Sequence, residues 1–248
     1  MRIIKVPAIN GLGKTKGAEL APDIIYKGKA HKIPANKENI EAQTALIYKE
    51  AKKHLAKNKC LFIGGDHSIS FPTTKAFFEK YPKGKLIVFD AHPDCMPPMK
   101  EPTHEEWLRG IIENRKIDGK NVLLIGARVI EPEEKEFLIK KNVQLISIEE
   151  IKNDLLDVIK KIKDFVGNKK IYLSFDIDVF DSSIVEATGY PVKQGLFENE
   201  AMNLLEVIIK NADVIAGDIV EVNPLIEKAG KDKTIYLARK IVGMFSNN

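Results

Sequence analysis

The sequence predicts an α/β fold in which helices cover both faces of a central parallel sheet, built as a single domain over residues 1–248. Short apolar runs alternate along the chain with longer segments of helical periodicity, which is the element order of α/β domains. Most of these runs are apolar at nearly every position, as in strands buried on both sides of a parallel sheet. No low-complexity linker or internal repeat divides the chain, so we expect one domain.

The expected strands are short stretches rich in Val, Ile, Leu and Phe. In order, they are Ile3–Ile9, Cys60–Gly64, Leu86–Phe89, Val122–Ile125, Val143–Ile148, Ile171–Phe175 and Val214–Val220. Between them, apolar residues recur at three- and four-residue steps, which predicts amphipathic helices. The clearest helical stretches are Ile40–Lys57, Glu131–Lys141, Ile151–Ile162, Leu204–Ile208 and Lys233–Phe245.

Charge and composition argue against several classes of protein. The 39 basic and 35 acidic residues leave a net charge of +4 that is spread along the chain, so we expect no nucleic-acid or membrane partner. No apolar run approaches the roughly 18 residues that a membrane span requires, and residues 1–10 lack the core and cleavage site of a signal peptide. With two cysteines, Cys60 and Cys95, the chain predicts a reducing, cytoplasmic location rather than a disulfide framework.

Polar clusters follow three of the predicted strands. Their sequences are Gly-Gly-Asp-His-Ser at 64–68, Asp-Ala-His-Pro-Asp at 90–94 and Ser-Phe-Asp-Ile-Asp-Val-Phe-Asp at 174–181. Side chains alternate along an extended chain, so Asp90, His92 and Asp94 are expected to share one face if the extended conformation persists. Asp176 and Asp178 share a face for the same reason. Ligands of open α/β sheets bind beyond the carboxyl ends of strands, so these clusters form the candidate site.

Each cluster alone could be a turn, a helix cap or a hydrogen-bonded histidine. Together, five carboxylates and two imidazoles at the ends of apolar strands cannot all be buried unpaired, because an isolated buried charge is very costly. Two divalent cations would resolve this, since their charge balances that of four aspartates. The ligand set is rich in oxygen and contains no thiolate, which favours Mn²⁺ over Fe, Co, Ni or Zn.

These three motifs, in this order, resemble those of the ureohydrolase superfamily, which contains arginases, agmatinases and formiminoglutamases. Glu-Val-Asn-Pro at 221–224 resembles the family's late Glu-x-Asn-Pro segment, and Gly-Ala-Arg at 126–128 is a weaker match. The resemblance implies an arginase-like, three-layer α/β/α fold. It also implies a metal-dependent hydrolase that acts on C–N bonds of linear amidines, with two Mn²⁺ per chain and a small guanidino substrate.

The resemblance further implies roles for individual residues. One Mn²⁺ would be held by His67, Asp90, Asp94 and Asp176, and the other by Asp90, His92, Asp176 and Asp178. A hydroxide between the metals would attack the guanidinium carbon, and Asp94 would orient it. Glu221 would bind the guanidinium, and His104 matches the histidine that protonates the leaving amine. The alternative for His104 is a solvated histidine at a helix start.

The substrate subclass depends on departures from the family pattern. Arginases read the substrate's α-carboxylate partly with an Asn at the position where this chain has Met96. The loop from Asp94 to His104 is also closer in length to that of agmatinases, so agmatine is slightly preferred. Glu131 falls where arginases keep an acidic residue for the substrate's α-amino group, although a Glu at a helix start also suits the helix dipole. Tyr190, where the family usually has Thr, adds bulk near the expected mouth of the site.

Several alternatives stay open from the sequence. The runner-up is an arginase that converts L-arginine to ornithine and urea, followed by a hydrolase of another guanidino or formimino compound. A deacetylase is less favoured, because the chain has no His-His pair. A catalytically silent relative that keeps the metals is the non-enzymatic alternative. The resemblance also implies a homo-oligomer, either a trimer or a hexamer.

Overall fold

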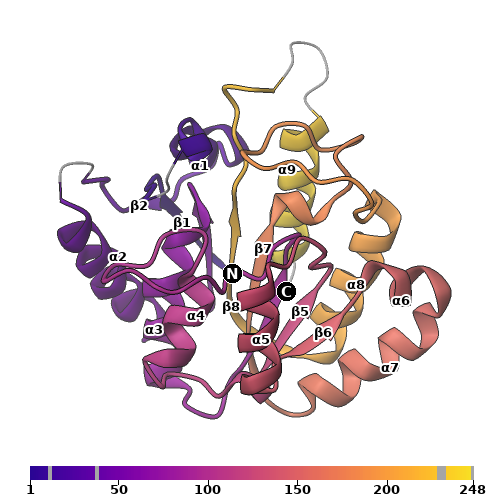
Figure 1. The fold of residues 1–248 in the computed structure, drawn as a ribbon. Coiled ribbons are helices and arrows are strands. Elements are labelled where there is room, and N and C mark those ends of the chain that lie inside the picture. Colours follow the sequence, from indigo (N-terminus) through magenta and orange to yellow (C-terminus); the bar gives the residue numbers. More distant parts are fainter. Residues whose placement is uncertain (11–12, 37–38, 228–232, 247–248) are drawn as a thin grey trace.

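A computed structural model describes residues 1–10, 13–36, 39–227 and 233–246 and contains one sheet of eight strands. Every neighbouring pair in this sheet is parallel, and the order is β2-β1-β3-β8-β7-β4-β5-β6 (Figure 1). The strands are β1 (Arg2–Val6), β2 (His31–Lys32), β3 (Cys60–Gly64), β4 (Lys85–Phe89), β5 (Val122–Ile125), β6 (Gln144–Ile146), β7 (Lys170–Asp176) and β8 (Asp213–Val220). The predicted fold class is therefore confirmed.

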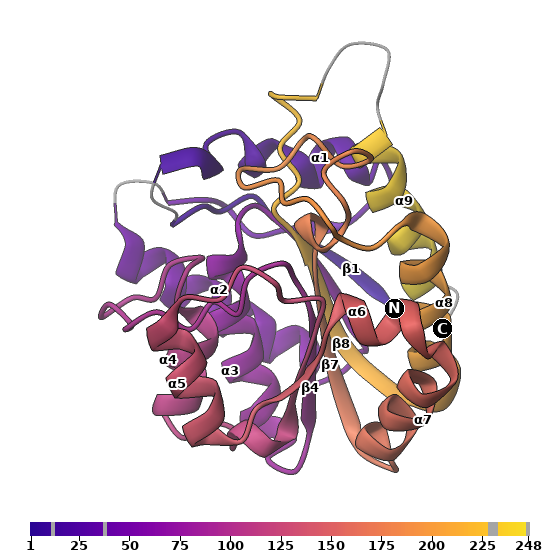
Figure 2. The same ribbon diagram turned by 45° about the vertical axis from the view of Figure 1, so that its right-hand side comes forward.

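Helices cover both faces of the sheet and complete a three-layer structure (Figure 2). They are α1 (Ala21–Ile25), α2 (Ile40–Leu55), α3 (Ser70–Lys80), α4 (Trp107–Glu113), α5 (Pro132–Lys141), α6 (Ile148–Asn153), α7 (Leu155–Val166), α8 (Glu198–Asn211) and α9 (Lys233–Ser246). Buried residues of α2 to α5 join the core on one face, and those of α1 and α6 to α9 join the core on the other. Among the helices of the described residues, none combines the length and apolarity that crossing a membrane requires.

Alternation along the strands supplies both cores. In β3, Leu61 and Ile63 belong to one core, whereas Cys60 and Phe62 belong to the other. All four side chains are fully buried, as expected for a parallel strand with helices on both sides. Cys60 and Cys95 are both buried free thiols.

Several element boundaries differ from the predicted ones for local reasons. The first strand ends at Val6 and not at Ile9, because Pro7 has no N–H to donate to the ladder. The predicted strand Val143–Ile148 is shorter, since Ser147 already caps α6 through Glu150. The helical stretch 151–162 is two helices, because Asp154 ends α6 and caps α7 by accepting a hydrogen bond from the N–H of Asp157.

Candidate metal centre and pocket

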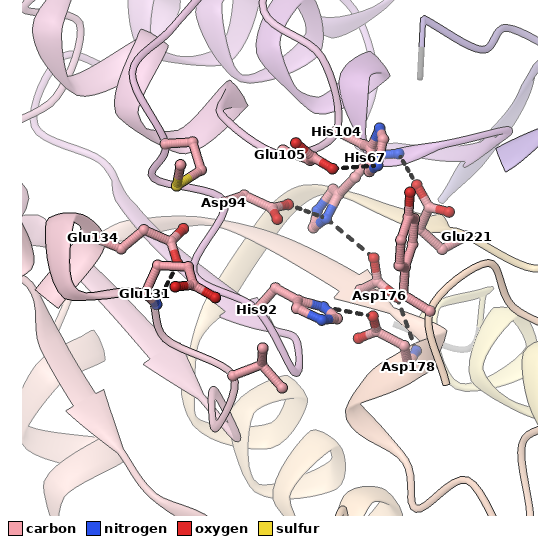
Figure 3. A pocket seen from close by; sticks show the side chains of 13 residues that line it. His67, His92, Asp94, His104, Glu105, Glu131, Glu134, Asp176, Asp178 and Glu221 are labelled. Carbon is pink, nitrogen blue, oxygen red and sulfur yellow. Dashed lines mark hydrogen bonds and ion pairs between the residues drawn. The ribbon is translucent and has the colours of Figure 1, made fainter. Parts of the chain in front are cut away.

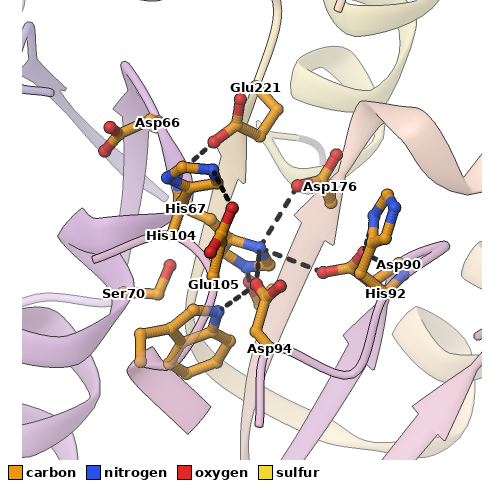
Figure 4. A network of polar contacts seen from close by, with 12 residues as sticks. Asp66, His67, Ser70, Asp90, His92, Asp94, His104, Glu105, Asp176 and Glu221 are labelled. Carbon is orange, nitrogen blue, oxygen red and sulfur yellow. Dashed lines mark hydrogen bonds and ion pairs between the residues drawn. The ribbon is translucent and has the colours of Figure 1, made fainter. Parts of the chain in front are cut away.

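The four central strands of the sheet end beside one another and carry the candidate site. In the order β3-β8-β7-β4 they are followed or ended by His67, Glu221, Asp176 and Asp90. Because all four strands are parallel, their carboxyl ends lie at the same edge of the sheet. Figure 4 shows these side chains converging on one point from separate strands.

The first candidate metal group surrounds the ring of His67. Its Nδ1 lies 3.0 Å from Asp90 Oδ2, 2.9 Å from Asp94 Oδ2 and 3.2 Å from Asp176 Oδ2. All four side chains are buried. One ring nitrogen therefore faces three carboxylate oxygens in a space from which water is largely excluded.

The second candidate group lies next to the first. His92 Nδ1 is 2.9 Å from Asp178 Oδ2 and 3.6 Å from Asp90 Oδ1. Asp90 thus presents one oxygen to each histidine, which is the position of a bridging ligand. The candidate ligand atoms of His67, Asp90 and Asp176 lie within 4.8 Å of one another, as do those of Asp90, His92 and Asp178.

The extended conformation on which the shared face of Asp90, His92 and Asp94 depends does not persist to Asp94. Asp94 has a φ of 51°, so the chain is not extended there. Asp90 and Asp94 both reach His67, whereas His92 reaches Asp178. The turn directs the Asp94 side chain toward the first candidate metal group, and the alternation of side chains along a strand does not predict such a turn.

Hydrogen bonds assign the tautomer of His67. Its Nε2 lies 2.9 Å from Ser174 Oγ, and that hydroxyl donates its proton to Asp218 Oδ1 at 2.6 Å. Nε2 must therefore donate to Ser174, which leaves Nδ1 to face the carboxylates. Tyr172 and Ser70 hydroxyls also donate to Asp218, so that carboxylate is fixed as an acceptor.

The protonation of the cluster shows why a cation fits there. Burial lowers the pKa of the His67 ring, but the three carboxylates outweigh it and raise that pKa well above its ordinary value. Burial raises the pKa of Asp94 to about 7, and the charge of Asp90 adds to this. Burial, with Asp178 and Asp90, likewise raises the pKa of Asp176. Protons compensate the crowded carboxylates here, and divalent cations can take their place because metal ligands bind deprotonated.

Glu221 brings an unpaired acceptor to the same site. Its φ is 64°, a left-handed conformation that is uncommon for residues other than glycine. Its Oε1 accepts a hydrogen bond of 2.7 Å from the N–H of His67, whereas its Oε2 is buried with no hydrogen-bond partner among the described residues. Burial, together with the charge of Asp66, raises its pKa well above the ordinary value. A cationic group could satisfy this oxygen.

His104 is buried and not a solvated surface histidine. It is 6% exposed, and its ring stacks on that of Tyr190 with centroids 5.5 Å apart and planes at 26°. Neither ring nitrogen has a hydrogen-bond partner within the described part of the chain, and burial lowers the pKa of the ring. A neutral imidazole with unsatisfied nitrogens is suited to exchange a proton with a ligand.

These residues line one pocket of about 350 Å³ (Figure 3). Its walls are formed by His67, His92, Asp94, Met96, His104, Glu105, Val129, Glu131, Glu134, Asp176, Asp178, Tyr190 and Glu221. Every predicted site residue except Asp90 is among them, and Asp90 lies beneath the two histidines that it contacts. The pocket therefore joins the metal groups to the outer residues expected to meet the substrate.

Comparison with known proteins agrees with this site. The model of the arginase family matches residues 3–246. The chain belongs to the arginase family. It is 31% identical over 193 residues to an agmatinase of Neisseria meningitidis serogroup A, covering 77% of this chain and 59% of that protein. The chain thus spans about three fifths of the length of that relative.

Two further members of the family extend the comparison. An arginase of Schizosaccharomyces pombe is 29% identical over 238 residues, which cover 85% of this chain and 71% of that one. The structure of the arginase from Bacillus caldovelox superposes with a TM-score of 0.90 at 21% identity, covering 100% of this chain and 98% of that one. The expected family and its arginase-like fold are both confirmed.

Glu131 has a structural task in this member of the arginase family. It is exposed and is the N-cap of α5, where it forms a reciprocal capping box with Glu134. Glu134 also accepts a hydrogen bond of 2.8 Å from the N–H of Cys95, which ties α5 to the turn after Asp94. Glu131 still lines the pocket, so its helix-capping role and a substrate contact are compatible.

Two residues to which the sequence analysis gave no role support the candidate metal groups. Trp107 is fully buried, and its Nε1 donates a hydrogen bond of 2.8 Å to Asp94 Oδ2. Arg128 donates hydrogen bonds to the backbone carbonyls of two segments and so joins them. These carbonyls belong to Asp178, Val179 and Phe180 in one segment and to Val192 and Lys193 in the other. Two signals were available, because Trp107 is the only tryptophan of the chain and Arg128 belongs to the Gly-Ala-Arg segment that resembles the family.

Proposed function

We propose that this chain is a binuclear manganese amidinohydrolase that releases urea from a guanidino compound carrying a second positive charge, with agmatine as the preferred example. One observation carries the proposal. The buried, unpaired Oε2 of Glu221 lies in the same pocket as the two groups of histidines and aspartates. A guanidinium would supply the missing donor next to the cluster where water can be activated.

The proposed metal ligands are His67, Asp90, Asp94 and Asp176 for one ion, and Asp90, His92, Asp176 and Asp178 for the other. Bound divalent cations would supply Lewis-acid activation of water and stabilise developing negative charge. Oxygen-rich ligands without thiolate support Mn²⁺ as the resident ion.

Three residues of the chain would carry the remaining steps. Glu221 would pair with the guanidinium and hold its carbon over the cluster. Asp94 would accept a hydrogen bond from the attacking water and fix its direction. His104 would take up a proton released by the attacking water and deliver it to the leaving amine. Its burial within the pocket and its ring nitrogens, which have no hydrogen-bond partner among the described residues, support this role.

The charge of the pocket supports a dicationic substrate. Its outer wall includes the carboxylates of Glu105 and Glu131, and no Lys or Arg of the described residues lines it. Met96, also in the wall, offers no donor for a carboxylate. The ammonium group of such a substrate, at the end away from the guanidinium, would be attracted to this wall, whereas a carboxylate there would be repelled.

L-Arginine is the second candidate, because one cation lies near the mouth. Lys14 Nζ is 5.2 Å from the centroid of the Tyr190 ring, and Tyr190 lines the pocket. A substrate carboxylate at the mouth could draw Lys14 from that ring. Under this alternative, Lys14→Ala lowers turnover of arginine and leaves turnover of agmatine unchanged.

A matched set of substrates tests the proposal. The Mn²⁺-loaded protein is assayed for urea release from agmatine, from 4-guanidinobutyrate and from L-arginine, which carry respectively an amine, a carboxylate and both. We expect kcat/KM to decrease in the order agmatine, L-arginine, 4-guanidinobutyrate. Glu131→Gln should raise KM for agmatine, because an attracting charge is lost, and lower KM for 4-guanidinobutyrate, because a repelling charge is lost. Preference for 4-guanidinobutyrate would refute the charge argument, and urea from none of the three would refute the activity.

A further inference from the structure

A second group of potential metal ligands lies at the outer edge of the sheet, away from the pocket. His31 is in the edge strand β2, and Glu50 and His54 are in the neighbouring helix α2 (Figure 1). Glu50 and His54 are one turn apart, so their side chains project from the same face of the helix. None of the three lines the pocket of the proposed active site.

The three side chains converge on one point. Glu50 Oε2 lies 3.0 Å from His31 Nε2 and 3.7 Å from His54 Nε2. The ring centroids of the two histidines are 4.6 Å apart. All three ligand atoms lie within 4.8 Å of one another.

Among the described residues, the Nε2 atoms of His31 and His54 are buried without a hydrogen-bond partner. His54 is 5% exposed, and its Nε2 has no hydrogen-bond partner among the described residues. The 3.7 Å that separate it from Glu50 are too long for a hydrogen bond.

The two measured spacings from Glu50 to the histidine nitrogens match those of a tetrahedral metal site. Two ligand atoms that each lie about 2.05 Å from Zn²⁺ are about 3.3 Å apart at the tetrahedral angle. The observed 3.0 Å and 3.7 Å bracket that value, so small side-chain shifts would equalise them. Two imidazoles and one carboxylate form a ligand set that suits Zn²⁺ and other late transition-metal ions.

We propose that His31, Glu50 and His54 bind a single Zn²⁺ or a similar transition-metal ion at a site separate from the binuclear cluster. Water would complete the coordination, because His31 also lines an open surface pocket of about 610 Å³. Lys53 Nζ now lies 3.4 Å from Glu50 Oε2, but its side chain is 66% exposed and free to swing into solvent when the ion binds. The ion links the two-residue edge strand β2 to helix α2 and so stabilises the edge of the sheet.

Equilibrium dialysis against Zn²⁺, followed by elemental analysis of the metal content per chain, tests this site. The wild type is compared with His31→Ala and His54→Ala, and Glu206→Gln serves as the control for a carboxylate on an exposed helix. Each histidine variant should hold one Zn²⁺ fewer than the wild type, whereas the control should hold the same number. Zn²⁺ that enters the pocket site is common to all variants and cancels in the difference.

Two features keep the outcome decisive. His31 is more exposed than His54, so His31→Ala carries the test if His54→Ala fails to fold, as circular dichroism would reveal. Lys53→Ala should keep the stoichiometry and tighten Zn²⁺ binding by about fivefold, because a competing positive charge is removed. Equal Zn²⁺ content in the wild type and in folded His31→Ala would overturn the proposal, whatever the enzymatic activity proves to be.

Discussion

Replacing Trp107 by Phe isolates one hydrogen bond of the candidate metal centre. The indole Nε1 donates to Asp94 Oδ2 at 2.8 Å, and the same oxygen lies 2.9 Å from His67 Nδ1. A hydrogen bond to a charged group contributes about 1.5–3 kcal/mol, so its loss should weaken Mn²⁺ binding by about 10- to 150-fold. The smaller ring should also lower the free energy of unfolding by about 1–3 kcal/mol, because it leaves a cavity.

Metal titration and urea unfolding separate these two effects. Phe77→Leu is the matched control, because Phe77 is a fully buried aromatic residue of the same core and lies outside the pocket. It should lower the free energy of unfolding to a similar degree and leave the affinity for Mn²⁺ unchanged. If Trp107→Phe bound Mn²⁺ as tightly as the wild type, the indole would only fill space, and the reasoning would be refuted.

Four further changes test other parts of the site and its frame. Asp176→Ala should abolish urea release and lower the Mn²⁺ content below two per chain by elemental analysis, and retained turnover would exclude the two-metal assignment. His104→Ala should keep both ions while kcat falls by about 10²–10⁴, and an unchanged kcat would remove His104 from catalysis. Arg128→Met should lower the free energy of unfolding in urea by about 3 kcal/mol or more, since several carbonyls lose a charged donor. Gly17→Ala should lower Tm in calorimetry, because the added Cβ would lie 2.2 Å from Asn223 Oδ1 at a φ of 109°; an unchanged Tm would mean that this contact relaxes freely.

The sequence predicted which residues gather at the candidate metal end of the pocket, because parallel strands bring their ends together. His67, Asp90 and Asp176 each follow or end an apolar strand, and strands that run parallel bring their carboxyl ends to one edge. The sheet class was enough to place residues more than a hundred positions apart at the same edge. The strand order then makes them neighbours, because β3, β8, β7 and β4 are adjacent in the sheet.

Other features depend on contacts between distant segments and could not be predicted in this way. The edge strand His31–Lys32 is two residues long and polar, so neither periodicity nor propensity marks it. The left-handed conformation of Asp94 interrupts the extended chain on which the alternation of side chains depends. The N–H groups of Leu108 and Arg109 stabilise this turn by donating hydrogen bonds to the carbonyl of Asp94. The bond from Trp107 follows from that turn, so it also escapes a local pattern.

The two ends of the pocket differ in construction, and this explains why the family is clear from the sequence while the substrate is not. The inner end is fixed by strand ends of a rigid sheet, whose short motifs specify both position and chemistry. The outer end is formed by Met96, Glu105 and Tyr190, which lie in connecting segments. Loops vary without disturbing the scaffold below them, so a family can keep one hydrolytic centre and exchange its substrates. In this chain, the outer wall is acidic and includes the bulky Tyr190, and the matched amine and carboxylate substrates measure what this wall selects.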